Sequence, residues 1–252
     1  MKTTIIVATH KPYWMPEDPV YLPVHVGAAG KESLGFQRDD EGENISGKNP
    51  NYCELTGLYW AWKNLDADCV GLAHYRRYFS KGFGKDKKER ILTQKDLEKK
   101  LSDTGVLLPK PRHYWIESNY SHYAHAHHAA DLDKTREILE EKCPEYIPAF
   151  DRCMKKTSGH RFNMFVMKKV LLDQYCTWLF GILFELEKRL DISSYSKNDS
   201  RVFGFVSERL LDVWIDTNSI PYKNTPYVFL ESQNWLVKGG NFIRRKLGYK
   251  KD

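Results

Sequence analysis

At residues 71–79 the chain reads "GLAHYRRYF", an apolar segment that runs directly into polar and basic side chains. The apolar lead-in predicts a buried strand. Directly behind it stand His74, Tyr75, Arg76, Arg77 and Tyr78. Two neighbouring arginines at a half-buried strand end repel each other unless an anionic group lies between them. The stretch therefore indicates either an anion site at the end of a strand or an exposed edge strand with basic outward positions.

Strands and helices are predicted to alternate on both sides of this stretch. We expect strands over 3–10, 21–30, 105–111 and 161–169, and a polar loop over 31–52. Helices are expected over 54–65, 93–101 (with Thr93 as N-cap), 117–142, 144–154, 171–190 and 201–215. This order predicts an α/β fold with a mostly parallel central sheet flanked by helices. In such sheets ligands bind beyond the carboxyl ends of the strands, where the 71–79 stretch ends.

Length and composition indicate a soluble globular protein. The 252 residues are 41% hydrophobic and 29% charged, which suits one α/β domain. No apolar run reaches the roughly 18–20 residues of a membrane span. The amino terminus, "MKTTIIVATHKPYW", has an apolar core too short for a secretory signal, so we expect a cytoplasmic protein. The five cysteines are odd in number and show no C-x-x-C spacing, which predicts reduced thiols and neither a zinc ribbon nor a disulfide framework.

The basic excess is partly local. The formal net charge is +6, and the segment 238–252 carries six Lys or Arg residues among bulky apolar ones. We therefore divide the chain into a domain over 1–237 and a basic tail over 238–252. Such a tail suits an anionic membrane surface, nucleic acid or a solvated terminus. A nucleic-acid surface normally spreads basic residues along one face, whereas here they are scattered or terminal, so we expect no nucleic acid.

Five segments together resemble one bacterial family. They are "NIS" (44–46), "ELTGLYWAWKN" (54–64), "GLAHYRRYF" (71–79), "NMFVMKK" (163–169) and "RVFGFVSERLLDVW" (201–214). The resemblance is to a domain-of-unknown-function family found among capsule, exopolysaccharide and lipopolysaccharide genes and assigned to glycosyltransferases. It implies a GT-A-like domain that uses a UDP-sugar donor, with galactofuranose or galactose as the favoured sugar. The implied acceptor is a saccharide or a lipid-linked saccharide at the inner face of the membrane.

The resemblance gives the strand end a chemical interpretation. Sugar transfer needs a group that stabilises the departing diphosphate, and guanidinium groups bind phosphate oxygens in pairs. His74, Arg76 and Arg77 are therefore predicted to form a diphosphate clamp that requires no metal. Many GT-A enzymes instead hold Mg²⁺ or Mn²⁺ with an Asp-x-Asp directly after a strand. Asp66-Ala67-Asp68 stands before the strand, which predicts a solvated turn, and the pair Asp39-Asp40 stays open as an alternative source of metal ligands.

A general base is predicted on the last helix. Inverting GT-A enzymes commonly place it at the start of a late helix, which points to Glu208. A surface ion pair of Glu208 with Arg209 is the alternative. Arg201, which opens the same helix, is predicted to bind phosphate or to pair with Glu208.

Further donor and acceptor contacts follow from the same resemblance. The predicted donor-binding residues stand after the first strand, in the polar loop and at the central motif: Thr9, His10, Lys11, Asn44, Ser46, Lys48, Tyr75 and Arg201. The predicted acceptor-binding residues are His127, Asp131 and Asn163, with a hydrogen-bonded His127–Asp131 pair as the alternative for the first two. Glu54 is interpreted as a helix cap only.

Two other interpretations compete with these. Within "HYAHAHHAADLD" (122–133), helical spacing of His125 with His128 and of His127 with Asp131 is also compatible with Zn²⁺. A non-catalytic carbohydrate- or nucleotide-sugar-binding partner is the alternative function.

Overall fold

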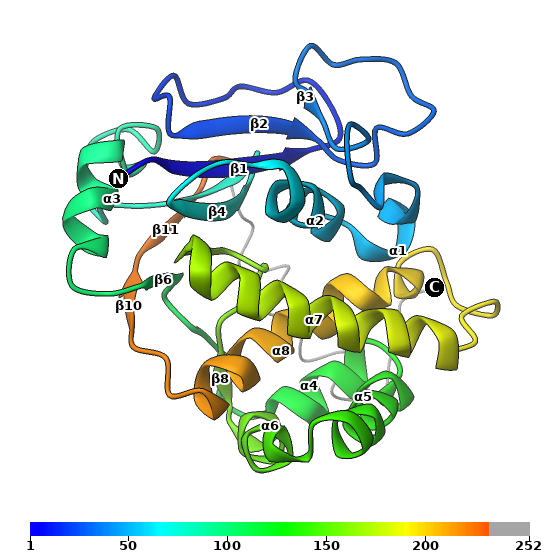
Figure 1. The fold of residues 1–252 in the computed structure, drawn as a ribbon. Helices are drawn as coiled ribbons and strands as arrows, with labels where there is room; N and C mark the ends of the chain where they lie inside the picture. The colour runs from blue at the N-terminus through cyan, green and yellow to red at the C-terminus, as the bar shows by residue number, and fades with distance from the viewer. Residues whose placement is uncertain (232–252) are drawn as a thin grey trace.

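The computed structural model describes residues 1–231, and its centre is a nine-stranded sheet (Figure 1). The strands of this sheet are β1 (Thr3–Thr9), β2 (Tyr21–His25), β3 (Gln37–Arg38), β4 (Cys69–His74), β5 (Arg77–Phe79), β6 (Val106–Pro109), β9 (Phe165–Lys168), β10 (Tyr222–Thr225) and β11 (Tyr227–Phe229). A separate short ladder joins β7 (Arg112–His113) to β8 (Ser158–Gly159). The predicted tail over 238–252 lies outside the described residues.

The main path of the sheet is mostly parallel. Its strand order is β10-β6-β9-β4-β1-β2-β3, and the hairpin partner β5 and strand β11 lie off this path. β9 pairs antiparallel with both β4 and β6, whereas the other pairs on the path are parallel. The amino end of β9 therefore lies at the same edge as the carboxyl ends of β1 and β4. That edge is where an α/β sheet binds its ligands.

Helices cover the sheet (Figure 1). They are α1 (Asn49–Tyr52), α2 (Leu55–Asn64), α3 (Gln94–Leu101), α4 (Asn119–Ala126), α5 (Ala129–Lys142), α6 (Ile147–Lys155), α7 (Lys169–Arg189) and α8 (Val202–Thr217). Single 3-10 turns are η1 (Ser46–Lys48), η2 (Pro144–Tyr146) and η3 (Asp199–Arg201). Within residues 1–231, no helix combines the length and the apolar character that crossing a bilayer demands.

The two faces of the sheet build two separate cores. In β1, Ile6 and Ala8 point into the larger core with α2, α7 and α8, while Ile5 and Val7 point into a smaller core with α3 and β5. A strand buried on both faces needs a continuous apolar run, because alternate residues enter different cores. This accounts for the unbroken run of buried residues in β1. The predicted α/β fold with a mostly parallel sheet flanked by helices is confirmed.

Three sequence predictions about local structure need correction. Residues 161–163 precede β9 and form a turn in place of a strand, with φ of 77° at Phe162 and 53° at Asn163. The helical region 117–142 breaks into α4 and α5, because His127 leaves the helical conformation with φ −142° and ψ −149°. The segment 31–52 contains β3, η1 and α1 rather than loop alone. The Thr93 cap is confirmed, as a capping box in which Thr93 and Asp96 bind each other's backbone.

Candidate active site

The opening motif forms a tight hairpin. β4 ends at His74, β5 begins at Arg77, and these two residues pair across Tyr75 and Arg76 at the turn. The turn sends the two guanidinium groups to different surroundings. Arg76 is exposed and forms an ion pair with Glu231 at 3.1 Å. The two predicted clamp arginines are therefore not side by side.

Arg77 is a half-buried cation without an ion-pair partner among residues 1–231. Its guanidinium carbon lies 3.7 Å from the ring centroid of Phe162 and 4.8 Å from that of Phe229. Its Nε has no hydrogen-bond partner in the described part of the chain. Burial lowers the pKa of Arg77 to about 10, and the carboxylates of Glu208 and Glu54 oppose that shift. A guanidinium with a buried N–H that lacks a partner is costly, so this position favours an anionic ligand.

A second group of cations surrounds the carboxyl end of β1. His10 and Lys11 follow β1 directly and are exposed. The ring of Tyr75 lies 5.4 Å from the His10 ring and 5.4 Å from Lys11 Nζ. Partial desolvation lowers the pKa of His10, and the charges of Lys11, Arg76, Lys31 and Arg201 lower it further. The predicted donor residues His10, Lys11, Tyr75 and Arg201 are thus brought to one electropositive region, which we call the basic cluster (His10, Lys11, Lys31, Arg76 and Arg201).

His74 is a neutral hydrogen-bond donor. Its Nε2 lies 2.8 Å from the carbonyl oxygen of Phe162, which only accepts, so Nε2 carries the proton. Burial lowers the pKa of His74 to about 3, with the charge of Arg77 as the next cause. His74 therefore holds the Phe162 turn in place and adds no positive charge of its own at neutral pH.

The pKa of His74 predicts an acid-sensitive contribution to stability. Because the folded-state pKa lies below the ordinary value of 6.5, the unfolded chain binds the proton first as pH falls. The free energy of unfolding should then drop below pH 6.5 by up to about 1.4 kcal/mol per pH unit. His74→Gln keeps a donor but cannot titrate, so urea unfolding between pH 7 and about pH 5 should show a shallower loss of stability for this variant. Parallel curves for the two proteins would contradict this assignment.

The turn at Phe162 and Asn163 is strained and held on every side. A left-handed conformation is rare for a bulky residue such as phenylalanine, and such strain gathers at functional sites. The Phe162 N–H donates to Glu208 Oε1 at 3.1 Å. Asn163 donates to Glu54 Oε1 at 2.7 Å and to the Gly204 carbonyl at 3.1 Å. The predicted acceptor residue Asn163 is fully buried and positions its neighbours.

Two carboxylates, Glu54 and Glu208, meet at this turn. Glu208 is engaged through both oxygens, by the Phe162 N–H and by Arg209 at 3.2 Å. Glu54 uses only Oε1 in its described hydrogen bonds, and burial raises its pKa. The interpretation of Glu54 as a cap only is wrong: it stands at the N-cap of α2, yet its carboxylate makes no cap bond and reaches Asn163. The negative charges of both carboxylates favour the protonated form of Arg77 and so raise its pKa, against the effect of burial.

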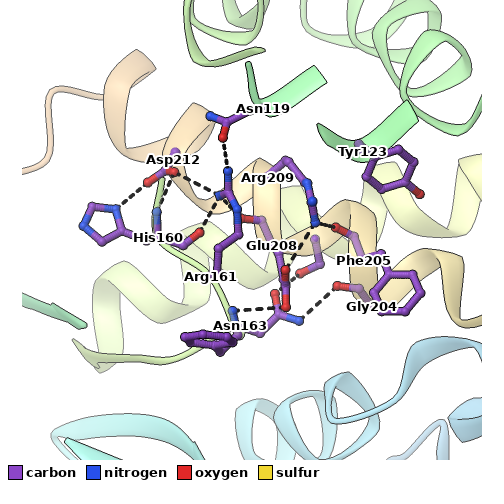
Figure 2. Close-up of polar contacts among 12 residues, drawn as sticks. Asn119, Tyr123, His160, Arg161, Asn163, Gly204, Phe205, Glu208, Arg209 and Asp212 are labelled. Carbon is purple, nitrogen blue, oxygen red and sulfur yellow. Dashed lines mark hydrogen bonds and ion pairs between the residues drawn. The ribbon is translucent and has the colours of Figure 1, made fainter. Parts of the chain in front are cut away.

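Charged side chains join the Phe162 turn to the middle of α8 (Figure 2). Arg161 is buried and donates to the carbonyl oxygens of His160 at 2.6 Å and Glu208 at 3.1 Å, to the side chain of Asn119, and to Asp212 at 3.5 Å. Asp212 also accepts from the ring of His160 at 2.5 Å. These hydrogen bonds connect residues 160 and 161, which directly precede Phe162, to α8. No local sequence pattern signals this network, because its members come from three distant segments of the chain.

Three predicted donor residues lie in loops that they organise. Ser46 is buried and donates to the Asp39 carboxylate, which also accepts from the backbone N–H groups of Gly27 at 2.8 Å and Ala28 at 3.0 Å. Asn44 caps the same loop by accepting from the Ser46 N–H at 3.1 Å.

Thr9, another predicted donor residue, is buried. Its hydroxyl donates to the Lys11 carbonyl oxygen at 2.7 Å and so stabilises the turn after β1. Lys48 pairs with Glu187 of α7 at 2.7 Å.

The carboxylates weighed as metal ligands already have protein partners. Asp39 accepts the three hydrogen bonds just described, and Asp40 pairs with Arg38 at 2.6 Å. Asp68 accepts from the Lys2 N–H at 2.6 Å, at the opposite edge of the sheet from Arg77. Within residues 1–231, no group of three His, Cys, Asp or Glu side chains is arranged to hold a metal ion. These residues do not fit a metal site as they stand.

The two predicted acceptor residues at the α4–α5 junction do not pair with each other. His127 contacts Asp199 at 3.0 Å and stacks on Phe205 at 4.2 Å. Asp131 accepts from Tyr123 and Tyr195, both at 2.7 Å. The alternative of a His127–Asp131 hydrogen bond is wrong, and the helical spacing assumed for zinc fails because the helix breaks at His127. His127 therefore lies against the side of α8 that carries Phe205.

Comparison with known proteins now places the chain. The model of the family DUF4422, a domain of unknown function, matches residues 4–219. The chain belongs to this family. Comparison of the DUF4422 chain with curated proteins found no match.

A solved structure gives the DUF4422 chain a close structural relative. It is described as the apo structure of the WbbM bifunctional glycosyltransferase, and it matches with a TM-score of 0.86 and 32% sequence identity. The match covers 92% of this chain and 46% of that one, so the DUF4422 chain spans about half the length of WbbM. The fold of this chain is therefore that of a region of a glycosyltransferase, in agreement with the GT-A-like α/β fold that the resemblance implied.

Proposed function

We propose that the chain is a glycosyltransferase that moves a sugar from a UDP-sugar to a saccharide acceptor of surface polysaccharide synthesis. Galactofuranose and galactose are the favoured sugars, and the acceptor is a lipid-linked or growing chain. The observation that carries the proposal is the half-buried Arg77, which has no ion-pair partner in residues 1–231 and stands next to Arg76 of the basic cluster, at the ligand-binding edge of a fold matched by a glycosyltransferase. A non-catalytic sugar-nucleotide-binding protein is the alternative.

The proposed role of the cations is to stabilise the departing diphosphate. Arg77 directly follows the hairpin turn, and Arg76 of the basic cluster stands in that turn, so we infer that phosphate oxygens bound at the turn contact both. Guanidinium and ammonium groups then stabilise the negative charge that develops on UDP as its bond to the sugar breaks. His74 contributes by holding Phe162, on whose ring Arg77 rests.

We propose Glu54 as the general base. The sequence points to Glu208, but both oxygens of Glu208 already accept hydrogen bonds from protein donors, the Phe162 N–H and Arg209. Burial raises the pKa of Glu54, which makes its carboxylate a stronger base, and its Oε2 accepts no hydrogen bond from the residues in 1–231. In an inverting displacement Glu54 takes the proton of the acceptor hydroxyl, whose oxygen bonds to the anomeric carbon. The bond from that carbon to the diphosphate breaks, and its electron pair leaves with UDP.

Nucleotide binding tests the proposal in its simplest form. Calorimetry with UDP, GDP and CMP, each with and without EDTA, should show binding of UDP that survives EDTA, since protein cations take the place of a metal. Binding that requires Mn²⁺ would reject the metal-free clamp and favour Asp39 and Asp40 as metal ligands. Absence of binding to any nucleotide under either condition would reject the transferase and the sugar-nucleotide-binding alternative together.

A further inference from the structure

Two adjacent apolar side chains stand out from the surface between β7 and α4. Trp115 is 81% exposed and Ile116 is 59% exposed. Single exposed apolar residues are ordinary, but an exposed aromatic–aliphatic pair on one loop marks a contact surface. We call residues 110–117 the Trp115 loop.

The fold holds this pair outward. The base of the loop is fixed by pairing of Arg112 and His113 with β8. Tyr114 is buried, donates its N–H to the Thr157 carbonyl at 2.7 Å, and accepts from Arg161 Nε at 3.0 Å. Trp115 then takes the left-handed conformation with φ of 59°, which is strained for an aromatic residue. The buried and hydrogen-bonded Tyr114 therefore fixes the loop in the conformation that exposes Trp115 and Ile116.

Four cations lie on the Trp115 loop or on the segment that anchors it. Lys110 and Arg112 belong to the loop itself, and Lys155 and Lys156 precede Thr157, on which Tyr114 is anchored. All four are exposed, and none forms an ion pair with any residue in 1–231. The acid of the loop, Glu117, is buried beneath the rings of His122 and His125, at 2.8 Å and 2.6 Å. The surface around Trp115 is therefore basic.

We propose that the Trp115 loop docks the protein on an anionic lipid bilayer. Tryptophan with an aliphatic neighbour suits the interface between headgroups and acyl chains, and lysine and arginine around them suit anionic headgroups. A protein partner would not require a basic rim, and a free saccharide would not require Ile116. The contact itself does not depend on sugar transfer.

The position of the Trp115 loop also bears on the acceptor of the proposed sugar transfer, and this part of the inference rests on the proposed function. The Trp115 loop leaves the carboxyl end of β6, at the same edge of the sheet as the candidate active site. Through Tyr114 it touches Arg161, which in turn contacts the Glu208 carbonyl. A membrane contact here brings the site to the bilayer surface, where the saccharide of a lipid-linked acceptor begins.

Vesicle sedimentation tests the proposal with the full chain. Wild-type protein should bind vesicles of equal parts phosphatidylglycerol and phosphatidylcholine at least about tenfold more tightly than vesicles of phosphatidylcholine alone, as expected for a basic surface. The double variant Trp115→Ser/Ile116→Ser should lose about tenfold or more of the binding to anionic vesicles, since two apolar side chains no longer enter the interface. The matched control is Val170→Ser, an exposed apolar residue (61%) at the start of α7.

Vesicle binding and UDP binding together distinguish failure of the docking proposal from failure of the proposed function. Unchanged vesicle binding by the double variant, or no preference of the wild type for anionic vesicles, overturns the proposal and leaves a protein or a saccharide as the partner of this loop. Equal loss in Val170→Ser also overturns it. UDP binding is measured on the same samples: if it is normal while vesicle binding fails, only the docking proposal falls, and if UDP binding is absent while vesicle binding holds, only the proposed function falls.

Discussion

Replacing Glu54 by glutamine is expected to lower kcat for sugar transfer by about 100- to 10,000-fold, the usual contribution of a positioned general base. The carboxamide keeps an oxygen that accepts from Asn163, so the site should stay assembled and the affinity for UDP should be nearly unchanged. UDP release in the presence of a saccharide acceptor measures the first quantity, and calorimetry the second. A variant that turns over as fast as the wild type would contradict the assignment of Glu54.

Glu208→Gln is the matched comparison for Glu54→Gln. Its carboxamide oxygen still accepts from the Phe162 N–H, and only the ion pair with Arg209 is lost. A loss of one charged hydrogen bond predicts a fall in kcat of about tenfold. If Glu208→Gln is instead the variant that loses nearly all turnover, the base is Glu208, as the sequence pointed to.

The pH profile separates the two roles further. A base works only when deprotonated, so kcat rises with pH through the pKa of that group. Burial raises the pKa of Glu54, so the acidic limb of the wild-type profile should lie above the ordinary range of a glutamate. Glu54→Gln should lose that limb, and Glu208→Gln should keep it.

Arg77→Met is expected to weaken UDP binding by about 10- to 150-fold, the effect of removing charged hydrogen bonds worth about 1.5–3 kcal/mol. The methionine replaces the buried stem without a charge, so packing on Phe162 and Phe229 is largely kept. Calorimetry with UDP measures the change. Arg76→Met should show a smaller loss, because Arg76 is exposed and already paired with Glu231.

Arg136→Met is the control for the arginine variants. Arg136 pairs with Asp151 between α5 and α6, so UDP affinity should not change. If Arg77→Met binds UDP like the wild type, the Arg77 guanidinium has a structural role only, and the clamp account of the hairpin fails.

Local signals in the sequence were enough to predict the framework. The apolar run of β1, the helical spacing of α2 and the Thr93 cap of α3 each depend on neighbouring residues, and each was predicted where the structure has it. The position of the 71–79 stretch at a ligand-binding strand end also followed from the alternation of strands and helices.

The internal geometry of the site could not be predicted in this way. Glu54 meets Asn163 across 109 residues of chain, and no local pattern signals such a contact. A phenylalanine in the left-handed conformation has no signature, unlike a glycine or asparagine, so residues 161–163 read as the start of a strand. The hairpin turn at Tyr75 and Arg76 contains none of the residues that usually signal a turn. The sequence therefore did not indicate that Arg76 and Arg77 enter different surroundings.

Sugar transfer by the purified full chain is the measurement that tests the central claim most directly. The chain is incubated with UDP-galactofuranose or UDP-galactose and a lipid-tailed galactoside acceptor, and UDP release and the enlarged glycoside are followed together. The account predicts both products in step with the wild type, in the presence of EDTA, and a large loss with Glu54→Gln. Release of neither product with either donor, from a protein that binds UDP, would contradict the account and leave a sugar-nucleotide-binding protein in its place.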